Sequence, residues 1–125
     1  MAAAAIFAGC GSYSPPSQAA ATPSESPALS LGRQVAVNMT EYHFSPNPIH
    51  VAPGPVVFQV INVGLVGHDF TVLTQDGHQR LTHTPLVSPG STVTLRLDLT
   101  PGTYPVVCTQ PGHQESGMEA RIEVG

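Results

Sequence analysis

Proline and glycine divide this chain into short segments, and that division limits what the chain can fold into. The sequence contains 13 prolines and 12 glycines in 125 residues. No window offers ten or more residues of helical periodicity free of both. Turn signals recur at short intervals, at Ser45-Pro-Asn-Pro48, Ala52-Pro-Gly-Pro55, Asp76-Gly77, Ser88-Pro-Gly90 and Thr100-Pro-Gly102. The chain is therefore expected to fold from short extended segments.

The segments between these turns have the alternating or β-branched pattern of strands. Six are expected, around residues 35–39, 56–61, 70–73, 93–97, 104–108 and 120–124. Six to eight short strands joined by Pro/Gly turns predict an all-β fold, and specifically an antiparallel β-sandwich with Greek-key connections.

The expected folding unit spans residues 34–125. The first 32 residues contain no Lys or Arg and are crowded with Ala, Ser and Pro. Residues 10–33 are expected to form a flexible tether, because they offer too little large apolar surface to offset the entropy lost on ordering. The remaining residues are enough for one small sandwich.

Residues 1–9 have the apolar core and small-residue end of a secretion signal, and are too short for a membrane-spanning helix of about 20 residues. The ending Phe7-Ala-Gly-Cys10 resembles the lipobox of bacterial lipoproteins, in which the cysteine is acylated. No basic residue precedes it, and Phe7 stands where Leu is usual. An ordinary cleaved signal, or an Ala-rich start without such a role, stays open. The resemblance implies export and a lipid anchor at Cys10, on the outer face of the cytoplasmic membrane or in the periplasm.

The charge of the chain excludes one class of partner. Four basic and eight acidic residues give a net charge of −4, and no Lys/Arg cluster occurs. Nucleic-acid binding needs a basic patch, so the sequence predicts no nucleic-acid partner.

One loop near the C-terminus concentrates the metal-binding chemistry. It runs Cys108-Thr-Gln-Pro-Gly-His113-Gln-Glu-Ser-Gly-Met118, with four residues between successive donor residues. Thiolate, imidazole and thioether favour copper, and two His, one Cys and a weak axial Met make the blue-copper electron-transfer pattern. The loop supplies three of these four ligands. His68, just before an expected strand, is the best candidate for the missing imidazole.

Each of these residues also has an ordinary interpretation. Cys108 could be a buried core thiol, or could form a disulfide with Cys10 that ties the domain to its own leader. His113 could be a turn residue beside Pro-Gly, and Met118 a core residue. The four residues taken together, with their strand context, favour the copper site.

The domain resembles a cupredoxin, of the plastocyanin/azurin and sulfocyanin-like kind, over residues 34–125. Besides the Cys-x4-His-x4-Met loop, the resemblance rests on Glu41-Tyr-His-Phe-Ser-Pro46, Pro53-Gly54, Asn62-Val-Gly64, Gly67-His-Asp-Phe70 and Pro101-Gly-Thr-Tyr104. It implies one type 1 copper ion, cycling between Cu(II) and Cu(I). His68, Cys108 and His113 would bind it in one plane, with Met118 as the long axial ligand and the Gly67 carbonyl on the opposite side.

The resemblance also indicates which residues support the ligands. Asp69 stands where cupredoxins often have Asn, and Thr109 is its expected partner in holding the loop. Pro111 has no N–H and cannot donate a hydrogen bond to the Cys108 sulfur. The amides of Asp69 and Gln110 are the remaining candidates.

The implied function is a one-electron carrier outside the cytoplasmic membrane. His113 would pass electrons to redox-partner proteins through an apolar surface patch, in small transient contacts. We expect a monomer. The alternative is a copper-binding protein for delivery or buffering, which would use the same four residues, although a rigid strand-loop-strand site favours electron transfer.

An enzyme is not expected. No His-x-His pair for further copper sites occurs, and the loop has one Cys where a binuclear centre needs two. Four protein ligands also leave no open position for substrate. His43, His50, His78 and His83 lack a Cys or paired His at ligand spacing, so exposure to solvent is expected; a loose second copper patch of His78 and His83 is the lesser alternative.

Overall fold

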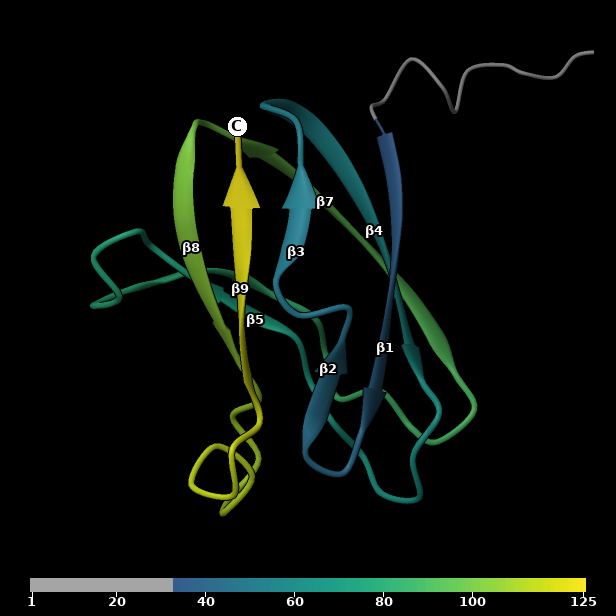
Figure 1. Ribbon diagram of the computed structural model, residues 1–125. Helices are drawn as coiled ribbons and strands as arrows, with labels where there is room; N and C mark the ends of the chain where they lie inside the picture. The colour runs from purple at the N-terminus through teal and green to yellow at the C-terminus, as the bar shows by residue number, and fades with distance from the viewer. Residues whose placement is uncertain (1–32) are drawn as a thin grey trace, which may run out of the picture. The chain divides into compact units, whose positions relative to one another are not determined.

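The structure of the protein is a computed structural model that describes residues 33–125. The secretion-signal segment 1–9, Cys10 and the proposed tether up to residue 32 lie outside the described residues. Two β-sheets pack face to face (Figure 1). Their nine strands are β1 (Arg33–Thr40), β2 (His43–Ser45), β3 (Ile49–Val51), β4 (Gly54–Asn62), β5 (Thr71–Leu73), β6 (Arg80–His83), β7 (Thr92–Leu99), β8 (Gly102–Val107) and β9 (Glu119–Val124).

The strands are divided between a sheet of four and a sheet of five. The first has the order β2-β1-β4-β7, and the second has the order β3-β9-β8-β5-β6. The prediction of an all-β sandwich is confirmed, and residues 33–125 contain no helix. Accordingly, no helix in this part of the chain is long and apolar enough to cross a membrane.

Two details of the prediction differ from the structure. The nine strands exceed the expected six to eight because β2, β3 and β6 have only three or four residues, too few for a clear alternation. The sheets are also mixed, since β1 pairs with β4 and β3 pairs with β9 in parallel. After β2 the chain crosses to the second sheet to form β3 and returns to form β4. Two strands joined by a hairpin must run antiparallel, whereas strands separated by a crossing between the sheets can pair in parallel.

The core fills the space between the sheets with apolar side chains from nearly every strand. Val37 and Met39 of β1 are fully buried and alternate with more exposed neighbours. Phe58 of β4 lies with its ring centroid 5.5 Å from that of Phe70, which contacts Phe44 edge-on at 5.7 Å. Burying each such ring stabilises the fold by about 1.5 to 3 kcal/mol. Tyr104 and Val106 of β8 belong to the same core, so the loop that follows β8 is attached to a rigid support.

The predicted metal-binding loop lies at one end of the sandwich. It connects β8 to β9 at the end opposite the C-terminus, where the turn between β1 and β2 also lies (Figure 1). Segments that are distant in the sequence therefore meet at this end.

Candidate metal centre

The loop between β8 and β9 is closed on itself by backbone hydrogen bonds. Cys108 directly follows β8, and its amide donates to the Met118 carbonyl at 3.2 Å. The Met118 amide donates to the His113 carbonyl at 3.1 Å. Gly112 and Gly117 adopt φ of 81° and 102°, a region that residues with a side chain rarely adopt. These two glycines allow the tight turns that bring His113 back beside Cys108.

His68 is held by a separate loop between β4 and β5. Its backbone forms a two-way bridge with Val87, at 3.2 and 2.8 Å. Asn62, at the end of β4, donates from its side-chain amide to the carbonyls of Val66 and Val87, both at 2.8 Å. The buried Asn62 side chain thus braces the segment that carries His68.

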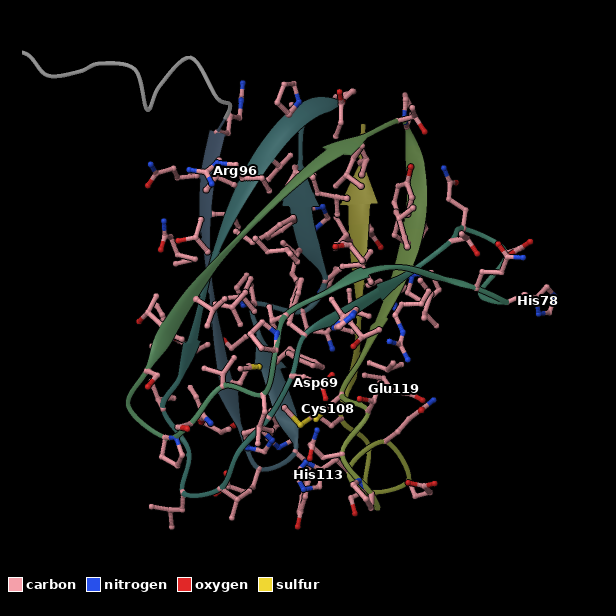
Figure 2. All side chains as sticks on the ribbon, turned by 180° about the vertical axis from the view of Figure 1, so that it is seen from behind. Asp69, His78, Arg96, Cys108, His113 and Glu119 are labelled. Carbon is pink, nitrogen blue, oxygen red and sulfur yellow. The ribbon has the colours of Figure 1, made fainter. Side chains whose placement is uncertain are left out.

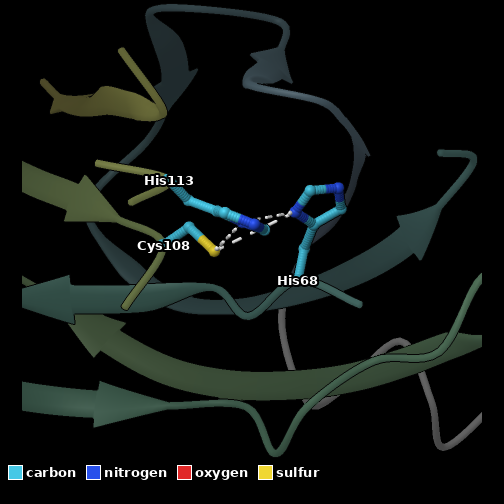
Figure 3. Close-up of side chains that lie close together, drawn as sticks. All are labelled: His68, Cys108 and His113. Carbon is cyan, nitrogen blue, oxygen red and sulfur yellow. Dashed lines mark hydrogen bonds between the residues drawn. The ribbon is translucent and has the colours of Figure 1, made fainter. Parts of the chain in front are cut away.

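Three donor atoms from these two loops form a compact triangle (Figure 3). The Nδ1 atoms of His68 and His113 lie 3.2 Å apart. The Cys108 Sγ lies 3.4 Å from Nδ1 of His113 and 4.0 Å from Nδ1 of His68. His68 and Cys108 are buried, whereas His113 is half-buried. The structure therefore brings together three of the four predicted ligands by their donor atoms.

The triangle has the dimensions of a trigonal metal site. For metal bonds of about 2.0 Å to nitrogen and 2.3 Å to sulfur, planar trigonal geometry separates nitrogen atoms by about 3.5 Å and nitrogen from sulfur by about 3.7 Å. The observed separations of 3.2, 3.4 and 4.0 Å lie close to these values. One thiolate and two imidazoles are the donor set of a blue-copper site. The residues present therefore fit copper.

The two remaining predicted donors, Met118 and Gly67, are directly connected to residues of the triangle. Met118 is fully buried, and its backbone contacts both Cys108 and His113. Gly67 immediately precedes His68, and a Cβ at this position would lie 2.9 Å from a methyl group of Leu86. The absence of a side chain at Gly67 therefore lets Leu86 pack closely over this segment.

Asp69 joins the His68 segment to the ligand loop. Its carboxylate accepts hydrogen bonds from the Thr109 amide at 3.1 Å, the Thr109 hydroxyl at 2.7 Å, the Gln110 side chain at 2.9 Å and the Thr71 hydroxyl at 2.8 Å. Burial raises the pKa of Asp69, but the hydrogen bonds from Gln110, Thr109 and Thr71 outweigh it and hold the pKa below its ordinary value. An ionised carboxylate therefore joins the two loops.

The sulfur of Cys108 belongs to a fully buried side chain. The Asp69 amide donates to Sγ at 3.5 Å. Burial nevertheless raises the pKa of the thiol, and the nearby Asp69 charge adds to the effect. Metal binding would therefore have to displace a proton from Cys108.

Two residues at this end of the molecule were not predicted to support the site. Glu41, in the turn between β1 and β2, contacts His68 Nε2 through Oε1 at 2.8 Å. Asn62 braces the His68 segment as described above. Both belong to motifs that indicated the family, Glu41-Tyr-His-Phe-Ser-Pro46 and Asn62-Val-Gly64. Position in a motif was the only signal for either residue.

Exposed apolar side chains flank the segment that carries His68, and one of them, Tyr42, reaches His113. Tyr42 contacts the His113 ring edge-on, with ring centroids 5.2 Å apart. Leu65 is 85% exposed, and Val66 and Leu86 are also exposed. We call these four residues, Tyr42, Leu65, Val66 and Leu86, the apolar rim.

The other four histidines, all in the part of the chain that the structure describes, do not join the donor triangle. His43, His50, His78 and His83 are all exposed, as predicted. Figure 2 shows His78 on a projecting loop, away from the end where Asp69, Cys108 and His113 gather. Within residues 33–125, neither His78 nor His83 joins a group of three possible His, Cys or carboxylate ligands.

Comparisons with known proteins relate this geometry to a family. The family model "Copper binding proteins, plastocyanin/azurin family" matches residues 32–125. A search of curated proteins finds no significant match. The fold is similar to that of reduced auracyanin from Roseiflexus castenholzii (TM-score 0.67, 17% identity), with 75% of this chain and 98% of that chain covered.

Two further solved structures have the same fold. Auracyanin A, described as a "blue" copper protein from Chloroflexus aurantiacus, has a TM-score of 0.61 at 19% identity, and the match covers 74% of this chain and 99% of that chain. Reduced rusticyanin has a TM-score of 0.59 at 23% identity, and the match covers 75% of this chain and 81% of that chain.

Proposed function

This chain belongs to the plastocyanin/azurin family of copper-binding proteins, and from that premise we propose that it carries single electrons by means of one type 1 copper ion. The observation that carries the proposal is the triangle of His68, Cys108 and His113 donor atoms, all within 4.8 Å of one another. Bound copper supplies a Cu(II)/Cu(I) couple.

We propose His68, Cys108 and His113 as the three strong ligands and Met118 as the long axial ligand. The burial of Met118 and the contact of its backbone with Cys108 and His113 support this assignment. The Gly67 carbonyl is the proposed weak donor on the opposite side. Burial of Cys108 and Met118 excludes water from the proposed sulfur ligands.

The residues of the site are suited to rapid electron transfer because they are held in place before metal binds. The Asp69 carboxylate and the Thr109 hydroxyl lie 2.7 Å apart and join the two ligand-bearing segments. A site whose ligands are fixed in this way reorganises little when its charge changes. Asp69 and Thr109 are thus proposed supports of the ligand geometry.

His113 is the proposed route for electrons to the surface. It is the only one of the three clustered residues that is not fully buried, and it lies beside Tyr42 of the apolar rim. Small contacts on such a surface suit transient exchange with redox-partner proteins. We propose that the protein acts as a monomer without an enzymatic reaction of its own.

Copper delivery or buffering is the second candidate function. It would require release of the metal from a site whose Cys108 and Met118 are completely buried. Such burial favours retention, so electron transfer is the better supported function.

One experiment separates the two functions. Voltammetry of the copper-loaded protein should give a reversible one-electron couple, and both oxidation states should retain copper against an excess of a Cu(I) chelator over many cycles. Irreversible voltammetry, with loss of Cu(I) to the chelator within a single cycle, would support delivery instead.

The N-terminal sequence supports a proposal about the location of the protein. We propose export, with the domain in the periplasm or anchored to the outer face of the cytoplasmic membrane through acylated Cys10. The basis is the lipobox-like sequence Phe7-Ala-Gly-Cys10. Mass spectrometry of the mature N-terminus tests it, because an unmodified or absent Cys10 would exclude the anchor.

A further inference from the structure

Glu41 contacts the most deeply buried histidine of the cluster. Its Oε1 lies 2.8 Å from Nε2 of His68, the ring nitrogen opposite the donor triangle. The His68 side chain has no exposed surface, whereas 27% of the Glu41 side chain is exposed. Among the ion pairs of residues 33–125, His68 is the one partner of Glu41. A carboxylate with no Lys or Arg partner therefore lies directly behind one proposed ligand.

The local backbone is arranged around this carboxylate. The Leu65 amide donates to both Glu41 oxygens, at 3.0 and 3.1 Å, and the Val66 amide approaches at 3.5 Å. A Cβ at Gly64 would collide with Oε1 of Glu41. The glycine at position 64 thus leaves the space that the carboxylate occupies, and Glu41 is fixed from two sides.

We propose that Glu41 is a positioning residue for His68 that lowers the reduction potential of the copper site. This inference rests on the proposed function. It assigns to Glu41 two separable effects: its oxygen atom fixes the tautomer of the His68 ring, and its negative charge stabilises the oxidised metal more than the reduced metal.

The tautomer effect follows from the hydrogen bond. In neutral imidazole, one ring nitrogen donates a proton and the other accepts. Because the Glu41 carboxylate accepts at Nε2, that nitrogen carries the proton and Nδ1 is left with its lone pair. Nδ1 is the atom that lies 3.2 Å from Nδ1 of His113 in the triangle. Glu41 thereby presents His68 as a ligand before metal binds.

The charge effect follows because the acceptor of this hydrogen bond, Glu41, is a carboxylate. A carboxylate that accepts from a metal-binding histidine raises the basicity of that ligand, and loss of such a partner typically costs about 10- to 100-fold in metal affinity. Oxidised copper carries one more positive charge than reduced copper, so the loss falls mainly on the Cu(II) form. A neutral acceptor in place of Glu41 would keep the hydrogen bond to His68 but would no longer stabilise Cu(II) relative to Cu(I).

The charge is tested by Glu41→Gln in the full chain, with Glu115→Gln as the matched control. Glu115 is an exposed carboxylate on the ligand loop. Glu41→Gln should weaken Cu(II) binding about 10- to 100-fold relative to Cu(I), which raises the potential by about 59 to 118 mV for a one-electron couple. The exposed charge of Glu115 is screened, so its loss should change that ratio by less than about twofold.

The tautomer is tested without any metal. Nitrogen-15 NMR of the metal-free protein should show the proton of His68 on Nε2 in the wild type and in Glu41→Gln, whose amide oxygen still accepts. Glu41→Ala should populate both tautomers. A His68 proton on Nδ1 in the wild type would overturn the tautomer role.

Equal shifts of the reduction potential in Glu41→Gln and Glu115→Gln would overturn the proposed effect of the Glu41 charge. Glu41 would then serve only to accept the hydrogen bonds of the Leu65 amide. Failure of the proposed function has a different signature. A wild-type protein that forms no thiolate-copper band would refute the copper site itself, while the metal-free NMR result would still decide the contact between Glu41 and His68.

Discussion

Asp69 accepts two hydrogen bonds from Thr109, one from the backbone amide at 3.1 Å and one from the hydroxyl at 2.7 Å. These bonds cross 40 residues of sequence and connect the segment carrying His68 to the loop carrying Cys108 and His113. The geometry of the proposed copper site therefore depends on one buried carboxylate that need not touch the metal.

Replacing Asp69 with Ala should destabilise the metal-free protein by about 2 to 4 kcal/mol, because it leaves the buried Thr71 hydroxyl and the partly buried donors of Thr109 and Gln110 without their acceptor. Urea unfolding measures the change. Asp98→Ala, at an exposed position of β7, is the matched control and should stay within about 0.5 kcal/mol of the wild type. Equal effects of the two substitutions would contradict the role of Asp69 in joining the loops.

The same carboxylate should make stability depend on acid. Its folded-state pKa lies below the ordinary value of 3.8, so its contribution is fully present above that value and is lost as pH falls through the lower folded pKa. Denaturant unfolding of the metal-free protein at a series of pH values should show this loss. Asp69→Asn should have a shallower acid limb, and an unchanged slope would mean that other groups dominate acid unfolding.

Removing the His113 side chain should open the copper site while leaving the sandwich folded. His113→Gly removes a half-buried ring from a loop and no part of the core. Copper affinity should fall, and added imidazole should bind in the vacated position and restore the colour. His78→Gly, in an exposed loop, is the control and should change neither. An unchanged spectrum in His113→Gly would refute the assignment of this ligand.

The apolar rim should control electron exchange between molecules. Leu65 is 85% exposed, so Leu65→Asp should leave the fold nearly unchanged. Two molecules that meet through their rims would then bring like charges together, and self-exchange should slow by about tenfold or more, which is a penalty of about 1.4 kcal/mol. NMR line broadening in mixtures of oxidised and reduced protein gives the rate. Leu81→Asp, on β6, should leave it unchanged; equal slowing would mean that net charge, rather than the rim, controls exchange.

Local patterns in the sequence were enough to predict the type of fold and three of the four proposed ligands. Turn residues and alternating strands predicted the all-β sandwich, because both act over a few residues. The Cys108 to Met118 loop was recognisable for the same reason, since three donors lie in one short stretch. The strands β2 and β3 were missed because three residues contain too little pattern. The parallel pairs were missed because they depend on where the chain crosses between the sheets.

The contacts behind the ligands were harder to foresee. Glu41 lies 27 residues before His68, and their contact depends on how the turn after β1 sits against the loop after β4. No spacing rule relates positions brought together by two different loops. The pairing of Asp69 with Thr109 was foreseen through family resemblance, which supplies such long-range information where chain pattern does not.

The most direct test of the central claim is an optical and EPR spectrum of the protein after addition of one equivalent of Cu(II). Coordination by Cys108 between His68 and His113 predicts an intense thiolate-to-copper band in the red part of the visible spectrum, with narrow copper hyperfine splitting. A pale spectrum with the wide splitting of ordinary Cu(II) would mean that Cys108 does not bind the metal, and would contradict the electron-carrier function.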